Sequence, residues 1–309
     1  MKSAPFILQK LKAQQAVVLL YVLDSKGSSP GRKGFNMAVA ADGVYEGTIG
    51  GGIMEVKLLE LAKNKLLNGD LSVVIKQQYH DKVHTYNQSG MICSGQQTVA
   101  LIPLTDKDIQ TVEILCSETH NTFQLDEKGL SIATQRVSDT LFVQTVPNYP
   151  IFFTPRKSKR VHIFGGGHVS LALSQLLSLL DFEIIVYDHR HELSTIQQNT
   201  FAHHTRIIDY DTDIQHIPFE LDDAIVIVSF SYRTDKQILL QLSNVQVRYM
   251  GMMGSATKVK TLFNELITEG GSATFLSNIS SPIGLKIHSK TTMEIAISIA
   301  AELIATYNR

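Results

Sequence analysis

The sequence of 309 residues has only two cysteines, no excess of charge of either sign and no long apolar run. Two cysteines are too few for a disulfide framework or a zinc site made mainly of thiolates, and they favour a reducing compartment. With 28 basic and 29 acidic residues, the chain lacks the basic signature of nucleic-acid-binding proteins. The apolar run of residues 16–23 is too short to cross a bilayer and has no small-residue cleavage site. We therefore expect a cytoplasmic protein with neither nucleic acid nor membrane as a partner.

The length predicts about two domains, and a hydrophobic content of 44% is enough for two ordinary cores. Residues 154–160 form a polar, basic, proline-containing stretch between two apolar regions. Such stretches are typical of domain boundaries. We therefore predict an N-terminal domain over residues 1–153, a linker over 154–160 and a C-terminal domain over 161–309.

Three consecutive glycines, Gly50, Gly51 and Gly52, stand directly before a predicted helix. Glycine lets the main chain adopt positive φ and lets a ligand approach the bare backbone. An apolar pattern at helical spacing, which predicts the buried face of that helix, consists of Ile53, Val56, Leu59 and Leu66. Because helix N-termini attract anions, the stretch predicts an anion site. The alternative is a tight turn without a ligand.

A second loop, residues 25–34, combines flexible backbone with hydroxyl groups and cations. Ser28, Ser29 and Arg32 are its candidate phosphate ligands; the alternative is an exposed connection made only of turn residues. A helix over residues 3–14, a buried strand over 16–23 and a hairpin with an Asp42-Gly43 turn surround it. The sequence does not place this loop beside the Gly50 stretch, so we assume that the two are close.

The segment of residues 80–95 contains His80, His84 and Cys93. The histidines lie four residues apart in a polar segment without a fourth ligand at the usual spacing, so we predict no metal site. Cys93 is either a buried structural thiol or a reactive thiolate at a glycine-containing turn. Strands are predicted over 71–79 and 97–102 and a helix over 109–116, with Cys116 as a core residue.

The C-terminal domain opens with a strand over residues 161–164, followed at once by Gly165, Gly167 and His168 and then by a helix over 171–180. A second strand ends at Asp188, about 20 residues after the glycines, where an acidic side chain can bind a nucleotide ribose. Ser170 replaces the third glycine of the motif and is still small. This order predicts a dinucleotide site, and a vestigial nucleotide site is the alternative.

Strands and helices alternate through the rest of the chain, which predicts a Rossmann-like, doubly wound parallel sheet. The expected strands are 206–208, 224–228 and 245–250, and the expected helices are 235–242, 256–268 and one ending near residue 307. Thr291 and Glu294 have the spacing of a capping box at the start of this last helix. The overall fold class is α/β, with a mixed N-terminal domain before the Rossmann-like one.

Six ordered blocks of the sequence together resemble the XdhC/CoxI family: residues 27–30, 47–55, 91–93, 165–169, 249–255 and 282–285. The resemblance spans residues 15–305. It implies an accessory factor for molybdenum hydroxylases such as xanthine dehydrogenase, one that holds the molybdenum cofactor (molybdopterin) as cargo and supports its sulfuration and insertion. Cys93 is then a sulfur or cofactor contact and Glu55 a second catalytic group, with Gly251 and Gly254 in the cofactor site. A cysteine desulfurase partner and a homodimer stay open.

The chain departs from the family pattern at three places. Ile53 stands where many relatives resemble a GGGC form, so a cysteine there is not required here. A His-rich stretch of the form THDHxxD reads Ser-Phe-Ser-Tyr-Arg-Thr-Asp at residues 229–235, without either histidine. Two arginines are replaced by Ala256 and Thr257, although Lys258 keeps one cation beside the loop. The ligand charge preference is therefore expected to differ.

Two other classes of function compete with the accessory factor. An NAD(P)-dependent oxidoreductase needs a positioned acid or base beside the nicotinamide, and His168 lies too near the expected pyrophosphate for that task. A pure interaction scaffold with a degenerate nucleotide fold would bind no small molecule. The leading hypothesis has both glycine loops holding one elongated anionic cofactor, with NAD(P) or another dinucleotide as a further candidate ligand.

Overall fold

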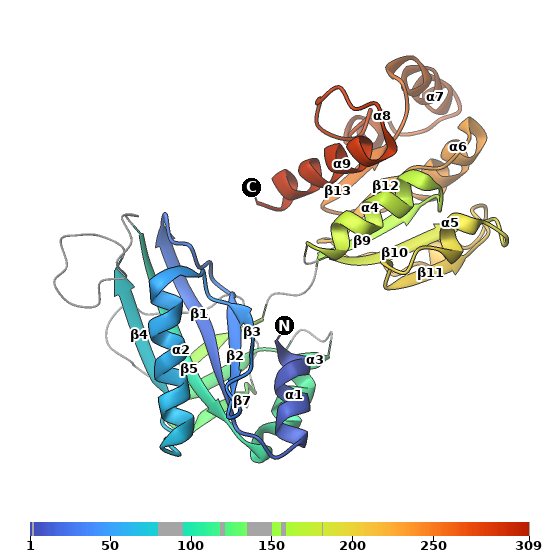
Figure 1. The fold of residues 1–309 in the computed structure, drawn as a ribbon. Helices are drawn as coiled ribbons and strands as arrows, with labels where there is room; N and C mark the ends of the chain where they lie inside the picture. The colour runs from blue at the N-terminus through green and yellow to red at the C-terminus, as the bar shows by residue number, and fades with distance from the viewer. Residues whose placement is uncertain are drawn as a thin grey trace. The chain divides into compact units, whose positions relative to one another are not determined.

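The computed structural model describes residues 1, 3–79, 95–117, 121–134, 150–155, 159–180 and 182–308. The chain divides into two compact units, Met1–Lys157 and Ser158–Arg309. Figure 1 shows the first unit in blue to green and the second in yellow-green to red. The N-terminal unit has two sheets and the C-terminal unit has one, and each unit has core clusters of its own.

An antiparallel sheet of five strands forms the centre of the N-terminal unit, in the order β3-β2-β1-β5-β4. Its strands are β1 (Val17–Gly27), β2 (Asn36–Ala40), β3 (Tyr45–Thr48), β4 (Val74–Tyr79) and β5 (Gly95–Leu104). The predicted hairpin is confirmed, because β2 and β3 pair antiparallel across Asp42 and Gly43. β1 continues to Gly27 and thus includes the start of the loop predicted over residues 25–34.

Both faces of β1 are buried, which explains its continuous apolar run. Val17, Leu19, Tyr21 and Leu23 belong to one core cluster, which also contains residues of α1 (Ala4–Lys12) and α3 (Ile109–Cys116). The intervening residues Val18, Leu20 and Val22 belong to a second cluster with α2 (Gly52–Leu67). Because successive side chains of a strand point to opposite faces, one strand supplies both cores.

A smaller antiparallel sheet closes the first core, in the order β7-β6-β8. Its strands are β6 (Phe123–Asp126), β7 (Gly129–Ile132) and β8 (Ile151–Phe153), and a short 3₁₀ helix, η1 (Asp106–Asp108), precedes α3. Phe153 packs against Tyr21 of β1 with ring centroids 4.5 Å apart. The small sheet therefore covers the same face of β1 as α1 and α3.

The C-terminal unit has the predicted doubly wound parallel sheet, in the order β11-β10-β9-β12-β13 (Figure 1). Its strands are β9 (Lys159–Phe164), β10 (Phe182–Asp188), β11 (His204–Ile207), β12 (Ala224–Ile227) and β13 (Tyr249–Met252). One face packs against α4 (His168–Ser178) and α9 (Thr292–Tyr307). The other packs against α6 (Tyr232–Gln241), α7 (Ala256–Thr268) and α8 (Ala273–Ser277). The remaining short helices are α5 (Ser194–Gln197) and η2 (Ile214–His216).

The capping box predicted for the last helix is confirmed. The Thr291 side chain accepts from the backbone N–H of Glu294, and the Glu294 carboxylate accepts from the backbone N–H of Thr291 at 3.1 Å.

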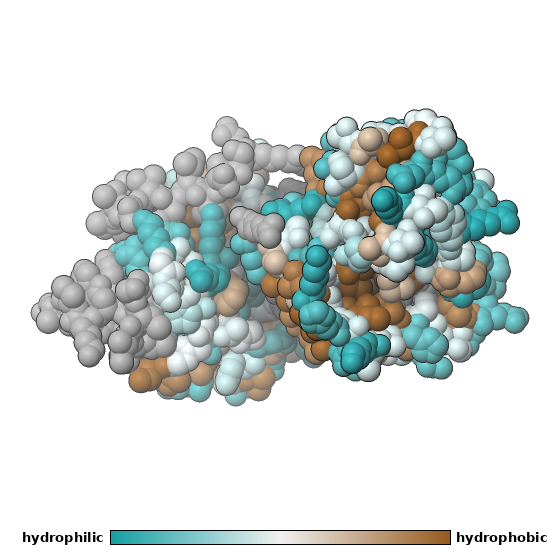
Figure 2. Space-filling model, turned by 90° about the horizontal axis from the view of Figure 1, so that it is seen from above, coloured by the Kyte–Doolittle hydropathy of each residue, from teal (hydrophilic) through white to brown (hydrophobic). Residues whose placement is uncertain are grey.

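Apolar side chains also reach the surface of the molecule, as the brown areas in Figure 2 show. Helix α9, for example, exposes Met293, Ile297 and Ile304. Within the described residues, no helix is both long and apolar enough to cross a membrane.

One prediction about side chains was partly wrong and a second was wrong. Helix α2 buries Met54, Leu58, Ala62 and Lys65. Of the predicted face, Leu59 and Leu66 are partly buried against the core, whereas Ile53 and Val56 are 56% and 57% exposed. The buried positions are spaced by about four residues, so the true face is rotated by one position from the predicted one. Cys116 is exposed, because it follows the buried Leu115 at the end of α3 and points to the next side of the helix.

Candidate functional site

The two glycine-bearing loops of the N-terminal unit contact each other through their backbones, which confirms the assumption that they are close. A Cβ atom built on Gly50 would lie 2.8 Å from the carbonyl carbon of Pro30, closer than carbon atoms approach. Gly50 also has a φ of +124°, which side-chain-bearing residues rarely adopt. Only glycine fits this position, so the close approach gives the glycine a structural reason beside any ligand.

A third segment, the start of β5, joins these two loops. A Cβ on Gly95 would lie 2.7 Å from the backbone nitrogen of Ser29. Gln97 is fully buried and links the loops, since its side chain oxygen accepts from the Ser29 hydroxyl at 3.0 Å and its amide donates to the carbonyl of Ile49 at 3.4 Å. Gln97 was not predicted from the sequence. Its signal was a pair of glutamines at the start of an otherwise apolar strand.

The candidate phosphate ligands of the first loop lie in different surroundings. Ser29 is buried against Gln97, whereas Ser28 and Arg32 are exposed. One Arg32 nitrogen lies 3.3 Å from the carbonyl of Gly27 and donates to it. Ser28 and Arg32 therefore remain accessible to a ligand, while Ser29 positions the loop.

The carboxylate of Glu55 lies on the N–H groups of the Gly50 loop. Its Oε2 accepts from the hydroxyl of Thr48 at 2.6 Å and from the backbone N–H groups of Ile49 at 2.8 Å and Gly51 at 2.9 Å. Burial opposes ionisation, but these hydrogen bonds outweigh it and hold the pKa of Glu55 below its ordinary value. The loop thus already presents an anion-binding surface, with a carboxylate of its own chain on it.

Gly51 and Gly52 extend this surface without obstruction. No atom lies within 4 Å of a Cβ built on Gly51, and Gly52 is exposed at the start of α2.

Cys93, His80 and His84 lie outside the described residues, so their predicted roles stay predictions. Among the described part of the chain, no group of three or more His, Cys, Asp or Glu side chains is arranged to hold a metal ion.

The glycine turn of the C-terminal unit joins β9 to α4. Gly165 has a φ of +110°, and a Cβ there would lie 2.6 Å from the carbonyl oxygen of Val228. Gly167 precedes α4 with open space beside it, and His168 is exposed in the first turn of that helix. The strand, turn and helix therefore have the arrangement in which a pyrophosphate binds a Rossmann fold.

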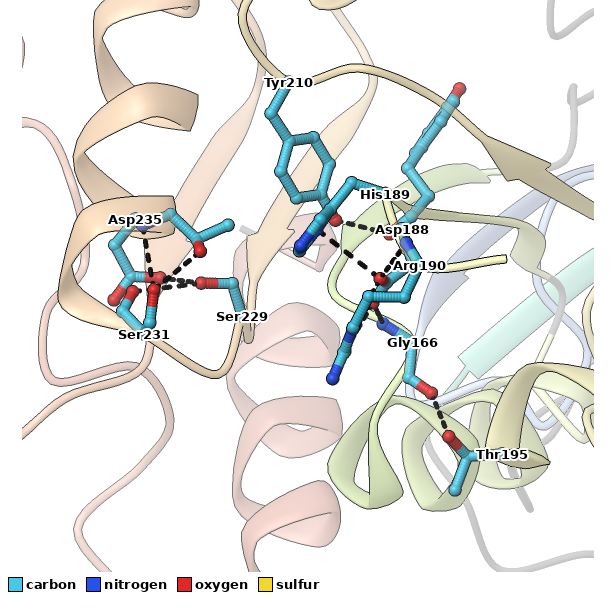
Figure 3. A network of polar contacts seen from close by, with 11 residues as sticks. Gly166, Asp188, His189, Arg190, Thr195, Tyr210, Ser229, Ser231 and Asp235 are labelled. Carbon is cyan, nitrogen blue, oxygen red and sulfur yellow. Dashed lines mark hydrogen bonds and ion pairs between the residues drawn. The ribbon is translucent and has the colours of Figure 1, made fainter. Parts of the chain in front are cut away.

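Asp188 lies at the end of β10 and is only 1% exposed (Figure 3). Its carboxylate accepts from the backbone N–H of Gly166 at 2.7 Å. It also accepts from the backbone N–H of Arg190 at 2.9 Å and from two guanidinium nitrogens of Arg190 at 2.8 and 2.7 Å. Burial opposes the charge, but these donors keep the pKa of Asp188 below its ordinary value. Asp188, which was predicted to bind a nucleotide ribose, thus already accepts hydrogen bonds from groups of its own chain.

A second polar cluster, which was not predicted from the sequence, lies after β12. The buried carboxylate of Asp235 accepts from the hydroxyl of Ser229 and from Lys258 Nζ at 2.6 Å (Figure 3 shows Ser229 and Asp235). Burial raises the pKa of Asp235, and these two hydrogen bonds only partly oppose the rise. The Lys258 ammonium group, which was expected to supply a cation beside the loop, is therefore paired with Asp235.

The last predicted glycines lie around the end of β13. Gly251 is buried in the strand, where a Cβ would lie 2.6 Å from the Ile283 side chain. Gly254 follows the strand and is partly exposed, with Val259 3.3 Å from a Cβ built on it. Packing alone thus explains the missing side chain at Gly251, whereas Gly254 borders the C-terminal edge of the sheet.

Two family models match this chain, one over part of the N-terminal unit and the other over most of the C-terminal unit. Residues 11–75 match the XdhC and CoxI family, and residues 161–303 match the XdhC Rossmann domain. The chain belongs to the XdhC and CoxI family. In this member, Asp235 is the acidic residue at the end of the stretch 229–235, which departs from the family pattern. Its partner Lys258 is the cation that remains beside the two positions where the family pattern has arginines.

Two curated proteins are similar in sequence to this XdhC and CoxI family member. It is 23% identical over 305 residues to the uncharacterized protein YqeB of Escherichia coli, covering 97% of this chain and 45% of YqeB. It is 29% identical over 150 residues to a Bacillus subtilis protein described as a probable xanthine dehydrogenase subunit, covering 48% of this chain and 43% of the relative. The chain thus spans less than half the length of these curated relatives.

A solved structure has the same fold. The crystal structure of a protein described as a xanthine dehydrogenase from Bacillus halodurans superposes with a TM-score of 0.74, at 21% identity, over 99% of this chain and 96% of that one. At this identity the likeness establishes the fold of the family member and not its activity.

Proposed function

We propose that the protein is an accessory factor for a molybdenum hydroxylase such as xanthine dehydrogenase. It binds the molybdenum cofactor as cargo and supports the sulfuration of the cofactor and its insertion into the hydroxylase. Membership in the XdhC and CoxI family supports this proposal, and so does the likeness to the probable xanthine dehydrogenase subunit of Bacillus subtilis. A cysteine desulfurase that supplies the sulfur, a homodimeric state and a cytoplasmic location belong to the same proposal.

The observation that carries the proposal is the meeting of three chain segments in the N-terminal unit. Residues 28–31, 49–52 and 95–97 converge on the buried Gln97 side chain. The backbone N–H groups at this place already bind one carboxylate, that of Glu55. The phosphate end of molybdopterin is an anion of the same kind, and it would use these donors by displacing Glu55 or bind beside them at the open Gly51.

In this proposal the Rossmann unit binds a ligand of its own, NAD(P) or another dinucleotide. Its glycine turn and the open N-terminus of α4 support a pyrophosphate there. An oxidoreductase is less well supported. Asp188, the carboxylate beside the turn, is paired with Arg190 and has a lowered pKa, so it is not poised to exchange a proton with a substrate.

The experiment compares two cysteine variants of the full chain, Cys93→Ser and Cys116→Ser. Each is purified from a host that makes the cofactor, its molybdenum content is measured, and its ability to activate a cofactor-free hydroxylase is assayed. Cys93→Ser should lose activation while its thermal stability stays close to that of the wild type, since serine is nearly isosteric but is a harder ligand. Cys116→Ser should keep activation, because Cys116 is exposed at the end of α3.

The outcome for the wild type decides the proposal itself. Wild-type protein without bound molybdenum that also fails to activate the hydroxylase would remove the accessory role. A Cys93→Ser variant that is destabilised and still activates the hydroxylase would leave the role intact and assign Cys93 to packing.

A further inference from the structure

The ion pair between Asp188 and Arg190 changes which group of the Rossmann unit meets a nucleotide. A carboxylate has about four lone-pair directions for hydrogen bonds. All four are occupied in Asp188, one by the backbone N–H of Gly166 and three by donors of Arg190, at distances of 2.7 to 2.9 Å. A ribose diol would bring two further donors to an acceptor that has none left. Asp188 is therefore a positioning residue that fixes the glycine turn and the arginine.

Arg190 is held in a defined place by this contact while part of it stays accessible. A guanidinium has five N–H donors, and two nitrogens of Arg190, Nε and Nη2, donate to Asp188. The side chain is 32% exposed, whereas that of Asp188 is 1% exposed. Among the described residues, its remaining N–H groups have no hydrogen-bond partner. The group that this end of β10 offers to a ligand is thus a cation with free donors.

An aromatic side chain from the neighbouring loop lies against the same arginine. The Arg190 guanidinium carbon is 4.5 Å from the ring centroid of Phe230, which follows β12 and is 63% exposed. The ring of His189 stacks on Phe230 as well, with centroids 5.8 Å apart and an angle of 20°. Arg190, His189 and Phe230 therefore form a layer of flat side chains between the ends of β10 and β12. In open parallel sheets, ligands bind at the carboxyl ends of the strands where the strand order reverses, here between β9 and β12.

We infer that the Rossmann unit selects an adenine nucleotide whose ribose carries a 2′-phosphate, and that Arg190 is the residue that determines this specificity. The inference rests on the proposed nucleotide site of this unit and names its ligand. The 2′-phosphate accepts from the free N–H groups of Arg190, which suit phosphate geometry. The adenine stacks on the face formed by Arg190 and Phe230. A plain ribose diol finds neither a free carboxylate nor an acceptor on Arg190.

The test measures dissociation constants of the full chain by titration calorimetry. Two pairs of probes are used: NADP⁺ against NAD⁺, and adenosine 2′,5′-bisphosphate against adenosine 3′,5′-bisphosphate. The second pair is matched in charge and differs only in the position of one phosphate. We expect the 2′-phosphorylated member of each pair to bind about tenfold or more tightly, as charge-assisted hydrogen bonds to phosphate allow.

Arg190→Gln should remove this preference in both pairs, and Arg190→Lys should keep part of it, because lysine retains the charge without the planar donors. The matched control is Arg248→Gln, an arginine of the same unit that pairs with the exposed Asp222 and should leave the preference unchanged. Because the wild-type ratios need no variant, a poorly folded Arg190→Gln does not prevent the test.

Equal binding within both pairs, tighter binding of NAD⁺ or no binding of any probe would each overturn the inference. So would a preference that Arg190→Gln and Arg190→Lys leave unchanged in folded protein. Activation of a cofactor-free hydroxylase by the wild type is assayed separately, so the accessory role and the nucleotide preference stand or fall on different measurements.

Discussion

The backbone N–H of Gly51 donates a hydrogen bond of 2.9 Å to the carboxylate of Glu55, four residues further along the chain. The same oxygen accepts from the N–H of Ile49 and from the hydroxyl of Thr48. A single side chain thus stabilises the glycine loop and satisfies donors at the start of α2 that a helix leaves unpaired. A ligand anion that uses these donors must compete with Glu55.

We predict that Glu55→Ala lowers the free energy of unfolding of the N-terminal unit by about 1–2 kcal/mol at neutral pH, because it leaves these donors unpaired. Glu55→Gln should lose less, since its amide oxygen still accepts. The folded pKa of Glu55 lies below its ordinary value, so its contribution is complete above about pH 4.3 and is lost as the pH falls through the folded pKa. Urea denaturation, read by hydrogen exchange of peptides from this unit, measures the difference between pH 7 and pH 3.

The control for this prediction is Glu60→Ala in the same helix. Glu60 is exposed, and its one ion pair within the described residues is with Lys63, at 3.4 Å. Removing its side chain should therefore change the stability little at either pH. A stability loss for Glu55→Ala that stays constant down to pH 3 would contradict the role given to its ionised form.

Gly50 and Gly51 make a second pair of variants whose effects should differ. Both have positive φ, so alanine at either position costs about 1–2 kcal/mol of backbone strain. At Gly50, alanine also meets the backbone of Pro30 and Gly31, whereas the space beside Gly51 is open. Gly50→Ala should therefore be less stable than Gly51→Ala by roughly 1–3 kcal/mol, the usual cost of overpacking. Equal melting temperatures for the two variants would show that the two loops are not in contact.

The sequence was sufficient to predict most of the long elements of both units, because their periodicity is strong and local, whereas the short elements β6, β7, β8 and α8 were not predicted and β13 begins four residues later than expected. β1 is a continuous apolar run, and the structure buries it on both faces. Helices α3 and α7 begin and end at the predicted residues. The rotation of α2 was missed because Ile53 and Val56 follow an apolar pattern that Met54, Leu58 and Ala62 satisfy equally well. Only the packing of the helix on the sheet decides between the two faces.

The chemistry of the sites was harder to predict, because it depends on contacts between residues far apart in the chain. Asp188 was expected to face a ribose, and its position at the end of β10 is as expected. Its partner Arg190 is only two residues away, yet no local pattern shows that the two side chains turn toward each other. The pair of Asp235 and Lys258 joins α6 and α7, and the sequence contains no signal for it.

Ser170 offers a test of the glycine turn through an unpaired hydroxyl. Its Oγ is fully buried and has no hydrogen-bond partner among the described residues. Removing an unpaired buried hydroxyl relieves its desolvation, and alanine is the better helix former. We therefore predict that Ser170→Ala is as stable as the wild type or more stable by up to about 1 kcal/mol, as measured by thermal unfolding.

The control lies one turn further along α4. Ser174 is equally buried, but its hydroxyl accepts from the Asn199 side chain at 3.0 Å. Ser174→Ala leaves that amide unpaired and should cost about 1–3 kcal/mol. If Ser170→Ala is destabilised as much as Ser174→Ala, the Ser170 hydroxyl has a partner and the prediction is wrong.

The pairing of Lys258 with Asp235 leads to a prediction that depends on pH. Lys258→Met removes the cation that faces a carboxylate of 1% exposure. We expect the variant to lose about 1–3 kcal/mol of unfolding free energy at neutral pH. This is below the range for breaking a fully buried ion pair, because Lys258 is itself 29% exposed. The folded pKa of Asp235 is already raised by burial, and without Lys258 it rises further.

The sign of the pH effect follows from this raised pKa. The folded variant holds a proton on Asp235 where the unfolded chain, with an ordinary pKa of about 3.9, has released it. Its stability therefore falls as the pH rises through that range, and the difference from the wild type should shrink as the pH is lowered from 7 toward 5. Lys236→Met is the control, because Lys236 pairs with the partly exposed Glu265 and Glu269 and leaves no buried charge behind. Urea denaturation of both variants at several pH values makes the comparison, and a Lys258→Met defect that grows toward pH 5 would show that Asp235 does not carry the uncompensated charge.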